Sequence, residues 1–354
     1  MRKVFIDNLK GNEILAKPIY TNNDLILLSQ GIRIKTSYIQ KLKELGIEYL
    51  FIEDEMSKGI EIVDFINERT RGECKREVKN VLEKFSTSGR VEMDAIAKIA
   101  QQIINDILSN EDVIVNISDI RRDDEYTYSH CVNVCSLSVL TAIKRGYSVE
   151  KARELAIGAL LHDLGMALIP QDILKNDGEL NDAEEELYQK HVIYGYDGVK
   201  DEKWLSGIAK VVILTHHERI DGSGYPFGWK GDRLHDSAKI VAVCDTFDTL
   251  TNNRNYKKSL KIYEVIEYLA AMKDILFDGD IVNTFVSYIA VYPSGTGVIT
   301  NTGQKGIVVR QNKNLPTRPV IRLLIEDNSG LEDDSSEIDL EQERTVFIID
   351  TFEL

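Results

Sequence analysis

The chain has 354 residues, 43% of them hydrophobic, and this length predicts two to three domains with ordinary buried cores. Its formal net charge of −15 argues against a nucleic-acid polymer or an anionic membrane surface as a nonspecific partner. No apolar run approaches the ~18 to 20 residues that span a bilayer, and the first residues lack the apolar stretch of a secretion signal, so we expect no membrane insertion.

Residues 1–62 predict a small α/β module. Short β-like runs occur at 13–19, 25–28 and 49–52, and one helical pattern covers 37–45 before Gly46. No residue cluster in this module points to a ligand.

Residues 63–115 predict two packing helices. Apolar residues recur at helical spacing from 65 to 110, and the run Ser86-Thr87-Ser88-Gly89 divides them. We expect these helices to pack on the neighbouring domain, with a coiled-coil dimer seam as the alternative.

The central block, residues 116–290, is helical by pattern and holds the chemistry. Five of the six histidines fall within 88 residues: His130, His162, His191, His216 and His217. His162 is followed directly by Asp163, and Asp245 supplies a further acid. Neutral imidazole and carboxylate are ligands that suit iron, manganese, zinc or nickel, so the block predicts a metal centre.

Apolar segments precede most of these residues, so we expect each ligand at or near the end of a rigid apolar segment. The segments cover 155–160, 211–214 and 238–243. Asn181 with Glu184 forms a capping-box signature for the helix expected to carry His191.

Residues 291–354 predict a small β-rich segment. Short apolar runs alternate with turn residues, 301–306 have the composition of a hairpin connection, and 326–337 are expected to form a solvated acidic loop. We expect this sheet to pack against or cover a neighbour rather than to act as a sensor.

The four cysteines, Cys74, Cys131, Cys135 and Cys244, show no disulfide-framework spacing. We expect reduced thiols in a cytoplasmic protein.

The motifs of residues 130–257 resemble the HD-GYP domain family, the branch of the HD superfamily that hydrolyses cyclic dinucleotides. The matching stretches are 162–165 (His-Asp-Leu-Gly), 216–218 (His-His-Glu), 221–226 (Asp-Gly-Ser-Gly-Tyr-Pro) and 245–248 (Asp-Thr-Phe-Asp). The resemblance covers a little under half of the chain. It implies an all-α HD-GYP domain at the centre and says nothing direct about either end. Together with the patterns of the two ends, the expected fold is an α+β multidomain protein with this central all-α HD-GYP domain, a small N-terminal α/β module and a small C-terminal β appendage.

The resemblance also implies a metal-dependent phosphodiesterase that opens cyclic di-GMP to linear pGpG, and on to GMP, with a hydroxide shared by two metals. Asp163 would bridge the metals. His130, His162 and Asp245 would complete one shell, and His191, His216 and His217 the other. Iron or manganese is implied, with zinc, nickel and cobalt as alternatives.

Members with three metals have a glutamate where this chain has Tyr126, and Asp124 and Glu125 are expected to point elsewhere, so two metals are expected.

The resemblance also implies which residues contact the substrate. Arg254 and Lys257 would meet phosphate oxygens, and the loop residues Gly224, Tyr225 and Pro226 would border the substrate. Asp248 occupies a further acidic position with a catalytic role, orienting Arg254 or a water. Glu218 and Asp221 are expected to hold the imidazoles.

One departure concerns turnover. The family pattern has a lysine where this chain has Met166, and two further family lysines are replaced by Asn176 and Glu179, with Lys175 shifted by one position. Losing one cationic donor can cost on the order of 10²-fold in rate. The alternatives are therefore a low-activity cyclic-dinucleotide receptor in bacterial signalling, with a homodimer or a signalling protein as partner, and a hydrolase of another cyclic dinucleotide or nucleotide phosphate ester.

Overall fold

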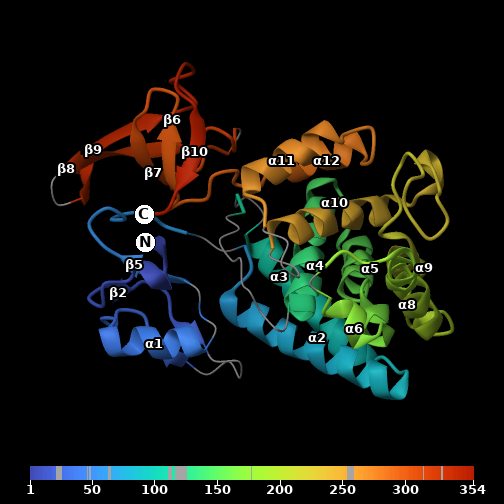
Figure 1. Ribbon diagram of the computed structural model, residues 1–354. Coiled ribbons are helices and arrows are strands. Elements are labelled where there is room, and N and C mark those ends of the chain that lie inside the picture. The colour runs from blue at the N-terminus through green and yellow to red at the C-terminus, as the bar shows by residue number, and fades with distance from the viewer. Residues whose placement is uncertain are drawn as a thin grey trace. The chain divides into compact units, whose positions relative to one another are not determined.

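The computed structural model describes residues 1–20, 26–45, 47, 49–62, 65–110, 114–115, 126–176, 178–252, 259–313, 315–327 and 330–354. The chain forms two compact units. One unit joins residues 1–64, 113–123 and 287–354, and the other joins 65–112 and 124–286. The prediction of a helical centre with a small α/β N-terminal part and a β-rich C-terminal part is confirmed (Figure 1).

The helical unit contains the two predicted packing helices and the central block. Its α-helices are α2 (Glu68–Ser88), α3 (Met93–Ser109), α4 (Tyr126–Lys144), α5 (Val149–Leu160), α6 (Gln171–Leu174), α7 (Asp182–Gln189), α8 (His191–Val199), α9 (Gly207–Thr215), α10 (Asp236–Thr251), α11 (Ile262–Ala271) and α12 (Gly279–Val286). Two short 3-10 helices, η2 (Leu164–Leu168) and η3 (Gly231–Arg233), lie between them. Among the described residues, no helix is both long and apolar enough to cross a membrane.

Local sequence explains the first of these helices. Asn67 caps α2 by accepting from the Arg69 amide, and Gly89 ends it in a left-handed conformation with φ of 65°. Its buried stripe follows helical spacing and consists of Cys74, Val78, Val81, Leu82 and Phe85. Because α2 packs on α4 and α3 packs on α5, the structure shows the expected packing of these helices on the central block (Figure 1). The dimer seam stays a prediction.

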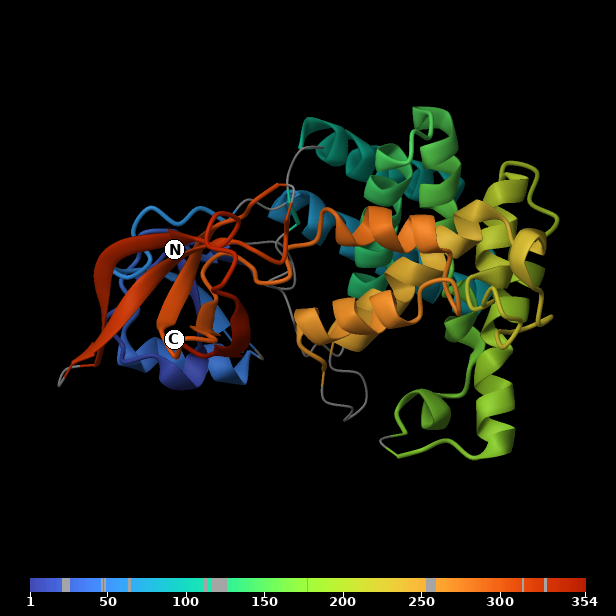
Figure 2. The same ribbon diagram turned by 90° about the horizontal axis from the view of Figure 1, so that it is seen from above.

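The core of the helical unit forms around α4, which packs on both α5 and α10. α5 also packs on α9, and α8 packs on α9 and on η2. The yellow-green segment that contains α6 and α7 extends away from this body (Figure 2). The contacts among α4, α5, α8, α9 and α10 bring helices that are distant in sequence side by side.

The other unit is built from both ends of the chain. Its N-terminal part contains β1 (Arg2–Phe5), a 3-10 turn η1 (Ile6–Asn8), β2 (Ile14–Leu15), β3 (Ile19–Tyr20), β4 (Ile26–Leu28), α1 (Thr36–Glu44) and β5 (Tyr49–Glu53). β5 pairs antiparallel with β1 and β2, and β3 pairs with β4. β1 was not predicted, and the expected helix stop Gly46 lies outside the described residues.

The C-terminal part is an antiparallel sheet in the order β10-β6-β7-β8-β9. Its strands are β6 (Gly297–Thr300), β7 (Lys305–Arg310), β8 (Val320–Asp327), β9 (Gly330–Asp339) and β10 (Ile348–Phe352). β6 and β7 form the predicted hairpin. The acidic loop predicted at 326–337 is wrong, because most of it is β9, which pairs with β8. β9 is an edge strand of this sheet.

The two terminal segments share a core. Ile60 packs in one cluster with Ile307, Val309, Val320 and Leu324. Arg322 donates to the carbonyls of Met56 and Lys58, and Arg2 donates to the carbonyl of Leu354 at 2.7 Å. The structure thus groups into one unit the segments 1–62 and 291–354 that were predicted as separate modules. It also places the packing helices of residues 65–110 in the same unit as the central helices.

Candidate metal centre

Five different helices or their ends supply the predicted ligands. His130 lies in the second turn of α4, and Asp245 lies within α10. His162 and Asp163 follow the end of α5, His191 begins α8, and His216 caps the C-terminus of α9. Asp245 follows the apolar segment 238–243, as expected, and is interior to α10. The capping box at Asn181 is present, but the helix that it starts ends at Gln189, before His191.

The structure brings all seven predicted ligands together in two groups. Within each group the candidate ligand atoms lie within 4.8 Å of one another. The first group consists of His130, His162 and Asp245. The second group consists of Asp163, His191, His216 and His217. All are buried except His217, whose side chain is 18% exposed. Buried donors gathered from distant parts of the chain are the arrangement that a metal requires.

The carboxylate of Asp163 lies between the two groups. Its Oδ2 atom is 3.7 Å from Nε2 of His130 and 3.5 Å from Nε2 of His162. Its Oδ1 atom is 3.4 Å from Nε2 of His191 and 3.8 Å from Nε2 of His216. Each oxygen thus faces a different group of imidazoles, so this carboxylate has the placement of a bridge.

Three imidazoles are fixed by carbonyls of their own chain segment. Nδ1 of His162 is 2.7 Å from the Ala159 carbonyl, and Nδ1 of His191 is 2.8 Å from the Tyr188 carbonyl. Nδ1 of His216 is 3.1 Å from the carbonyl of Ile213. Since a carbonyl only accepts, Nδ1 carries the proton in each ring and the Nε2 lone pair is directed into the cluster.

His130 is held in a different way, by a carboxylate. Its Nδ1 is 2.7 Å from Oδ2 of Asp248, and Asn133 donates from Nδ2 to Oδ1 of Asp248 at 2.9 Å. Asp248 is therefore placed behind His130. The contacts to Arg254 or a water predicted for Asp248 are not among those described. Asn133 was not predicted, although its position three residues after His130 puts both on one face of α4.

The loop after His217 closes one side of the cluster. The Tyr225 ring stacks on the His217 ring with centroids 4.7 Å apart. A Cβ at Gly224 would lie 2.3 Å from the His217 carbonyl and 2.5 Å from Cα of Glu218, so only glycine fits there. Gly224 and Tyr225 thus lie beside His217, and the substrate contacts implied for residues 224–226 stay a prediction.

Glu218 and Asp221 do not hold imidazoles as expected. The buried Glu218 carboxylate accepts from the amides of Phe227 and Trp229 at 2.8 and 3.0 Å. Asp221 is exposed and accepts from the amide and hydroxyl of Ser223. Both acids therefore shape the loop, because short carboxylates readily bond to nearby amides.

Burial and neighbouring charge set the protonation of the ligands. Burial alone would lower the pKa of His130, but the carboxylates of Asp245 and Asp248 raise it to about 10. Burial, together with His162 and His191, lowers the pKa of His216 to about 3. Burial opposes ionisation of Asp163, but the surrounding imidazoles hold its pKa well below the usual value. The cluster therefore contains ionised acids and at least one neutral imidazole, the forms that bind metals.

Met166 lies in an apolar cluster rather than in a charged rim. It is 5% exposed and packs with Ile169 and Ile173. Partly buried side chains from the segment up to α8 complete this cluster: Leu174, Leu180, Leu187, Tyr188 and Tyr194. Lys175 and Glu179 are exposed, and Asn176 turns back to accept from the Gly178 amide.

Some predicted positions lie outside the described residues. These are the substrate contacts Arg254 and Lys257 and the acids Asp124 and Glu125. The side chain of Tyr126 is likewise outside the described part, so the expected absence of a third metal stays a prediction.

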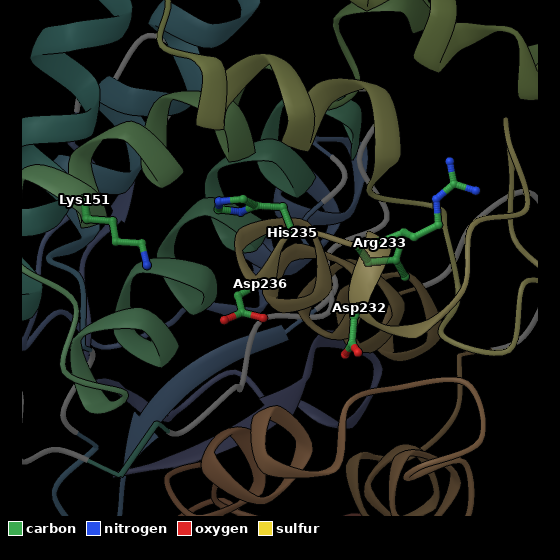
Figure 3. A pocket seen from close by; sticks show the side chains of 6 residues that line it. Lys151, Asp232, Arg233, His235 and Asp236 are labelled. Carbon is green, nitrogen blue, oxygen red and sulfur yellow. The ribbon is translucent and has the colours of Figure 1, made fainter.

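A pocket elsewhere on the helical unit has no predicted ligand in its lining. It is lined by Lys151 of α5 and by residues 232–236 (Figure 3). His235 in this lining caps α10, its Nδ1 accepting from the Ser237 amide at 3.1 Å. His235 lies ten residues before Asp245, about 15 Å along α10.

Comparison with protein families gives two adjacent matches. Residues 120–281 match the family described as HD domain, and residues 298–354 match the family described as KOW domain associated with HD domain. Among solved structures, Bd1817, an HDG"Y"P protein from Bdellovibrio bacteriovorus, has a similar fold. The TM-score is 0.51 at 19% identity, over 80% of this chain and 97% of that chain.

Several characterised relatives are cyclic-dinucleotide phosphodiesterases. The cyclic di-GMP phosphodiesterase PA4108 of Pseudomonas aeruginosa is 31% identical over 68% of this chain and 58% of its own length. The cyclic di-GMP phosphodiesterase response regulator RpfG of Xanthomonas campestris is 30% identical over 61% of this chain and 59% of its own length. The 3'3'-cGAMP-specific phosphodiesterase 2 of Vibrio cholerae is 30% identical over 51% of this chain and 35% of its own. The chain thus spans under three fifths of the length of these relatives.

The helical fold and the buried His-Asp cluster agree with the family match, so residues 120–281 form an HD domain. This domain carries the motifs of the HD-GYP type, the pair His162-Asp163 and the loop Gly224-Tyr225-Pro226, and its relatives are of that type.

Proposed function

We propose that this protein is a metal-dependent phosphodiesterase that hydrolyses cyclic di-GMP to linear pGpG, and on to GMP. The observation that carries the proposal is the placement of Asp163, whose two oxygens face two different groups of imidazoles. The relatives named as cyclic-dinucleotide phosphodiesterases support the substrate class.

The donor set fits two divalent transition-metal cations. One cation would be held by His130, His162 and Asp245. The other would be held by His191, His216 and His217. Asp163 would be a ligand of both. The set consists of nitrogen and oxygen donors without thiolate, which suits iron or manganese and allows zinc, nickel or cobalt. When bound, such a pair supplies a shared hydroxide near neutral pH and neutralises charge on the phosphoryl oxygens.

The chain's own residues prepare the site for this chemistry. The carbonyls of residues 159, 188 and 213 orient three imidazoles before any ligand arrives, so binding does not have to order them. Tyr225, stacked on His217, would form a wall of the substrate site, with Gly224 and Pro226 setting the path of the loop. Arg254 and Lys257 would contact phosphate oxygens.

One observation favours a second function, a receptor that binds a cyclic dinucleotide and cleaves it slowly. Met166 is buried among apolar side chains, so this position adds no positive charge beside a scissile phosphate. A homodimer and a signalling protein as partner, and a cytoplasmic location, remain predictions that belong with either function.

Product analysis under anaerobic conditions tests the proposal. Protein loaded with iron(II) or manganese(II) is incubated with cyclic di-GMP and, separately, with 3'3'-cGAMP, and products are separated by chromatography. Rapid linear product from cyclic di-GMP is expected. Tight binding of the dinucleotide without product supports the receptor, and faster cleavage of 3'3'-cGAMP reassigns the substrate.

Substitution of the bridging acid tests the site itself. Asp163→Asn is expected to lower metal content and to reduce turnover by at least about 10²-fold, since loss of mere supporting groups already costs 10- to 100-fold. The matched control is Asp221→Asn, an exposed acid that should change neither. An Asp163→Asn variant with full metal content and turnover would reject the assignment.

A further inference from the structure

A chain of hydrogen bonds runs from α2 to the candidate metal centre. Nη1 of Arg71 donates to Oδ1 of Asn133 on α4 at 2.9 Å. Nδ2 of Asn133 donates to Oδ1 of Asp248 on α10 at 2.9 Å, and Oδ2 of Asp248 is 2.7 Å from Nδ1 of His130. Nε2 of His130 then lies 3.1 Å from Asp245 and 3.2 Å from Nε2 of His162. Three helices thus meet in one polar connection.

Arg71 and Asp248 hold the amide of Asn133 from its two ends. An amide has one accepting oxygen and one donating nitrogen, and a guanidinium can only donate. With Arg71 occupying the oxygen, the nitrogen is left to face Asp248. The carboxylate of Asp248 favours the same orientation, because it only accepts. If Arg71 were absent, the amide oxygen would lose its donor, and the side chain of Asn133 would be anchored only at its nitrogen end.

The orientation of Asn133 matters because Asp248 is buried. Asp248 is 4% exposed, and a carboxylate removed from water is stable only with donors around it. Asn133 occupies one of its oxygens, which leaves the other for His130. Loss of the Asn133 donor would let the Asp248 carboxylate rotate away from Nδ1 of His130. The direction in which Nε2 of His130 points would then no longer be fixed.

We propose that Arg71 is a positioning residue for the metal centre: through Asn133 and Asp248 it holds His130 in its ligand orientation. The proposal deepens the proposed function and rests on it, because it takes His130 as a ligand. Arg71 acts on the group of His130, His162 and Asp245. The imidazoles of the other group are oriented by backbone carbonyls or lie beside Tyr225, and the relay touches none of them.

Metal titration of full-length variants tests this proposal. Arg71→Met removes the donor and keeps much of the side-chain volume. The matched control is Arg69→Met on the same helix, where the arginine is exposed and paired only with Glu73 among the contacts described. Stepwise manganese(II) binding is followed against a competing chelator, and electron paramagnetic resonance separates a coupled metal pair from a single ion.

Arg71→Met is expected to weaken one of the two metal-binding steps by about tenfold, the lower end of the range for outer supporting groups. At limiting metal, the signal of a single manganese ion should appear, while Arg69→Met keeps the coupled pair. Asn133→Leu should weaken the same step, and Arg71→Met combined with Asn133→Leu should be no worse than Asn133→Leu alone. Asn133→Leu also serves if Arg71→Met fails to fold.

Two negative results have different meanings. If the natural protein binds no pair of metals, the proposed function fails. If it binds two metals and both Arg71→Met and Asn133→Leu bind them with the same affinities, Arg71 has only a packing role and this inference is overturned. Effects that add in the double variant would also overturn it, because two links of one chain cannot act independently.

Discussion

At the residue scale, the candidate centre uses two ways of orienting an imidazole. His162, His191 and His216 each direct Nδ1 to a carbonyl three residues earlier, so a short local contact fixes the ring. His130 instead faces Asp248, which is 118 residues away along the chain. The first arrangement depends on helix geometry, whereas the second depends on how α4 and α10 pack.

The high pKa of His130 predicts that metal binding releases a proton. Without metal this imidazole has a pKa of about 10 and is protonated at pH 7.5, whereas His216, with a pKa of about 3, is already neutral. Metal must displace the proton of His130, so affinity should rise with pH by up to about tenfold per unit below pH 10. Calorimetry in buffers of different ionisation enthalpy measures the released proton.

Asp248→Asn provides the control for this prediction. It removes one of the two carboxylates that raise the pKa of His130, so fewer protons should be released at pH 7.5. Metal binding by the natural protein with no proton release would contradict the predicted charge on His130.

The surroundings of Met166 predict that a lysine there is destabilising. Met166→Lys would place an ammonium among Ile169, Ile173 and their neighbours, and we expect a loss of about 1–3 kcal/mol in the free energy of unfolding. Thermal or urea denaturation measures the change. Met166→Leu, which nearly conserves volume and polarity, should cost less than about 1.5 kcal/mol. Equal stability of the lysine variant would show that the cluster opens to water.

At the element scale, the site depends on close approach of η2 and α8. A Cβ at Gly165 would lie 1.9 Å from the His191 carbonyl and 2.6 Å from the amide nitrogen of Gly195. These are backbone atoms, which cannot move aside as a side-chain tip can. Glycine at 165 therefore allows the segment carrying Asp163 to lie directly against the helix that begins with His191.

Gly165→Ala is expected to separate these two elements and to displace His191 from Asp163. Metal binding should fall by at least tenfold, because ligands must stay within a few tenths of an ångström of their positions. Gly207→Ala is the matched control: nothing lies within 4 Å of its added Cβ, and alanine favours a helix. Chelator competition compares the two variants, and unchanged affinity in Gly165→Ala would show that the backbones can part without cost.

At the scale of the whole molecule, the two ends of the chain form one folding unit. Ile60 from the N-terminal part is 3% exposed and packs among residues of β7 and β8. Arg322 of β8 adds hydrogen bonds to the same N-terminal segment. The C-terminal sheet and the N-terminal module should therefore lose stability together.

Ile60→Ala in the full chain tests this coupling. Removal of a buried isoleucine side chain should cost about 2–4 kcal/mol, and amide exchange should rise in β7 and β8, far away in sequence. Ile26→Ala, at a position 58% exposed, should change stability by less than about 0.5 kcal/mol. Exchange that rises only in the N-terminal part would show that the shared core contributes little.

Local patterns in the sequence predicted much of this protein. The helices of 65–110, the capping box at Asn181 and the hairpin of 301–306 depend on neighbours within a few residues, and the structure contains each of them. The motifs around His162 and His216 selected the residues that gather in the cluster, because their types and spacing are themselves the signal. The acidic segment 326–337 was misread because strand pairing is stabilised by a partner strand, and charge alone does not reveal it.

Tertiary packing decided the rest. Only the meeting of α2, α4 and α10 brings Arg71, Asn133 and Asp248 into line behind His130, since no local pattern records contacts across more than sixty residues. Tertiary packing also buries Met166 in an apolar cluster and forms the shared core of the two chain ends. The residue types and motifs in the sequence are enough to identify the side chains that can donate to a metal. The directions in which these side chains point are set by which helices pack together.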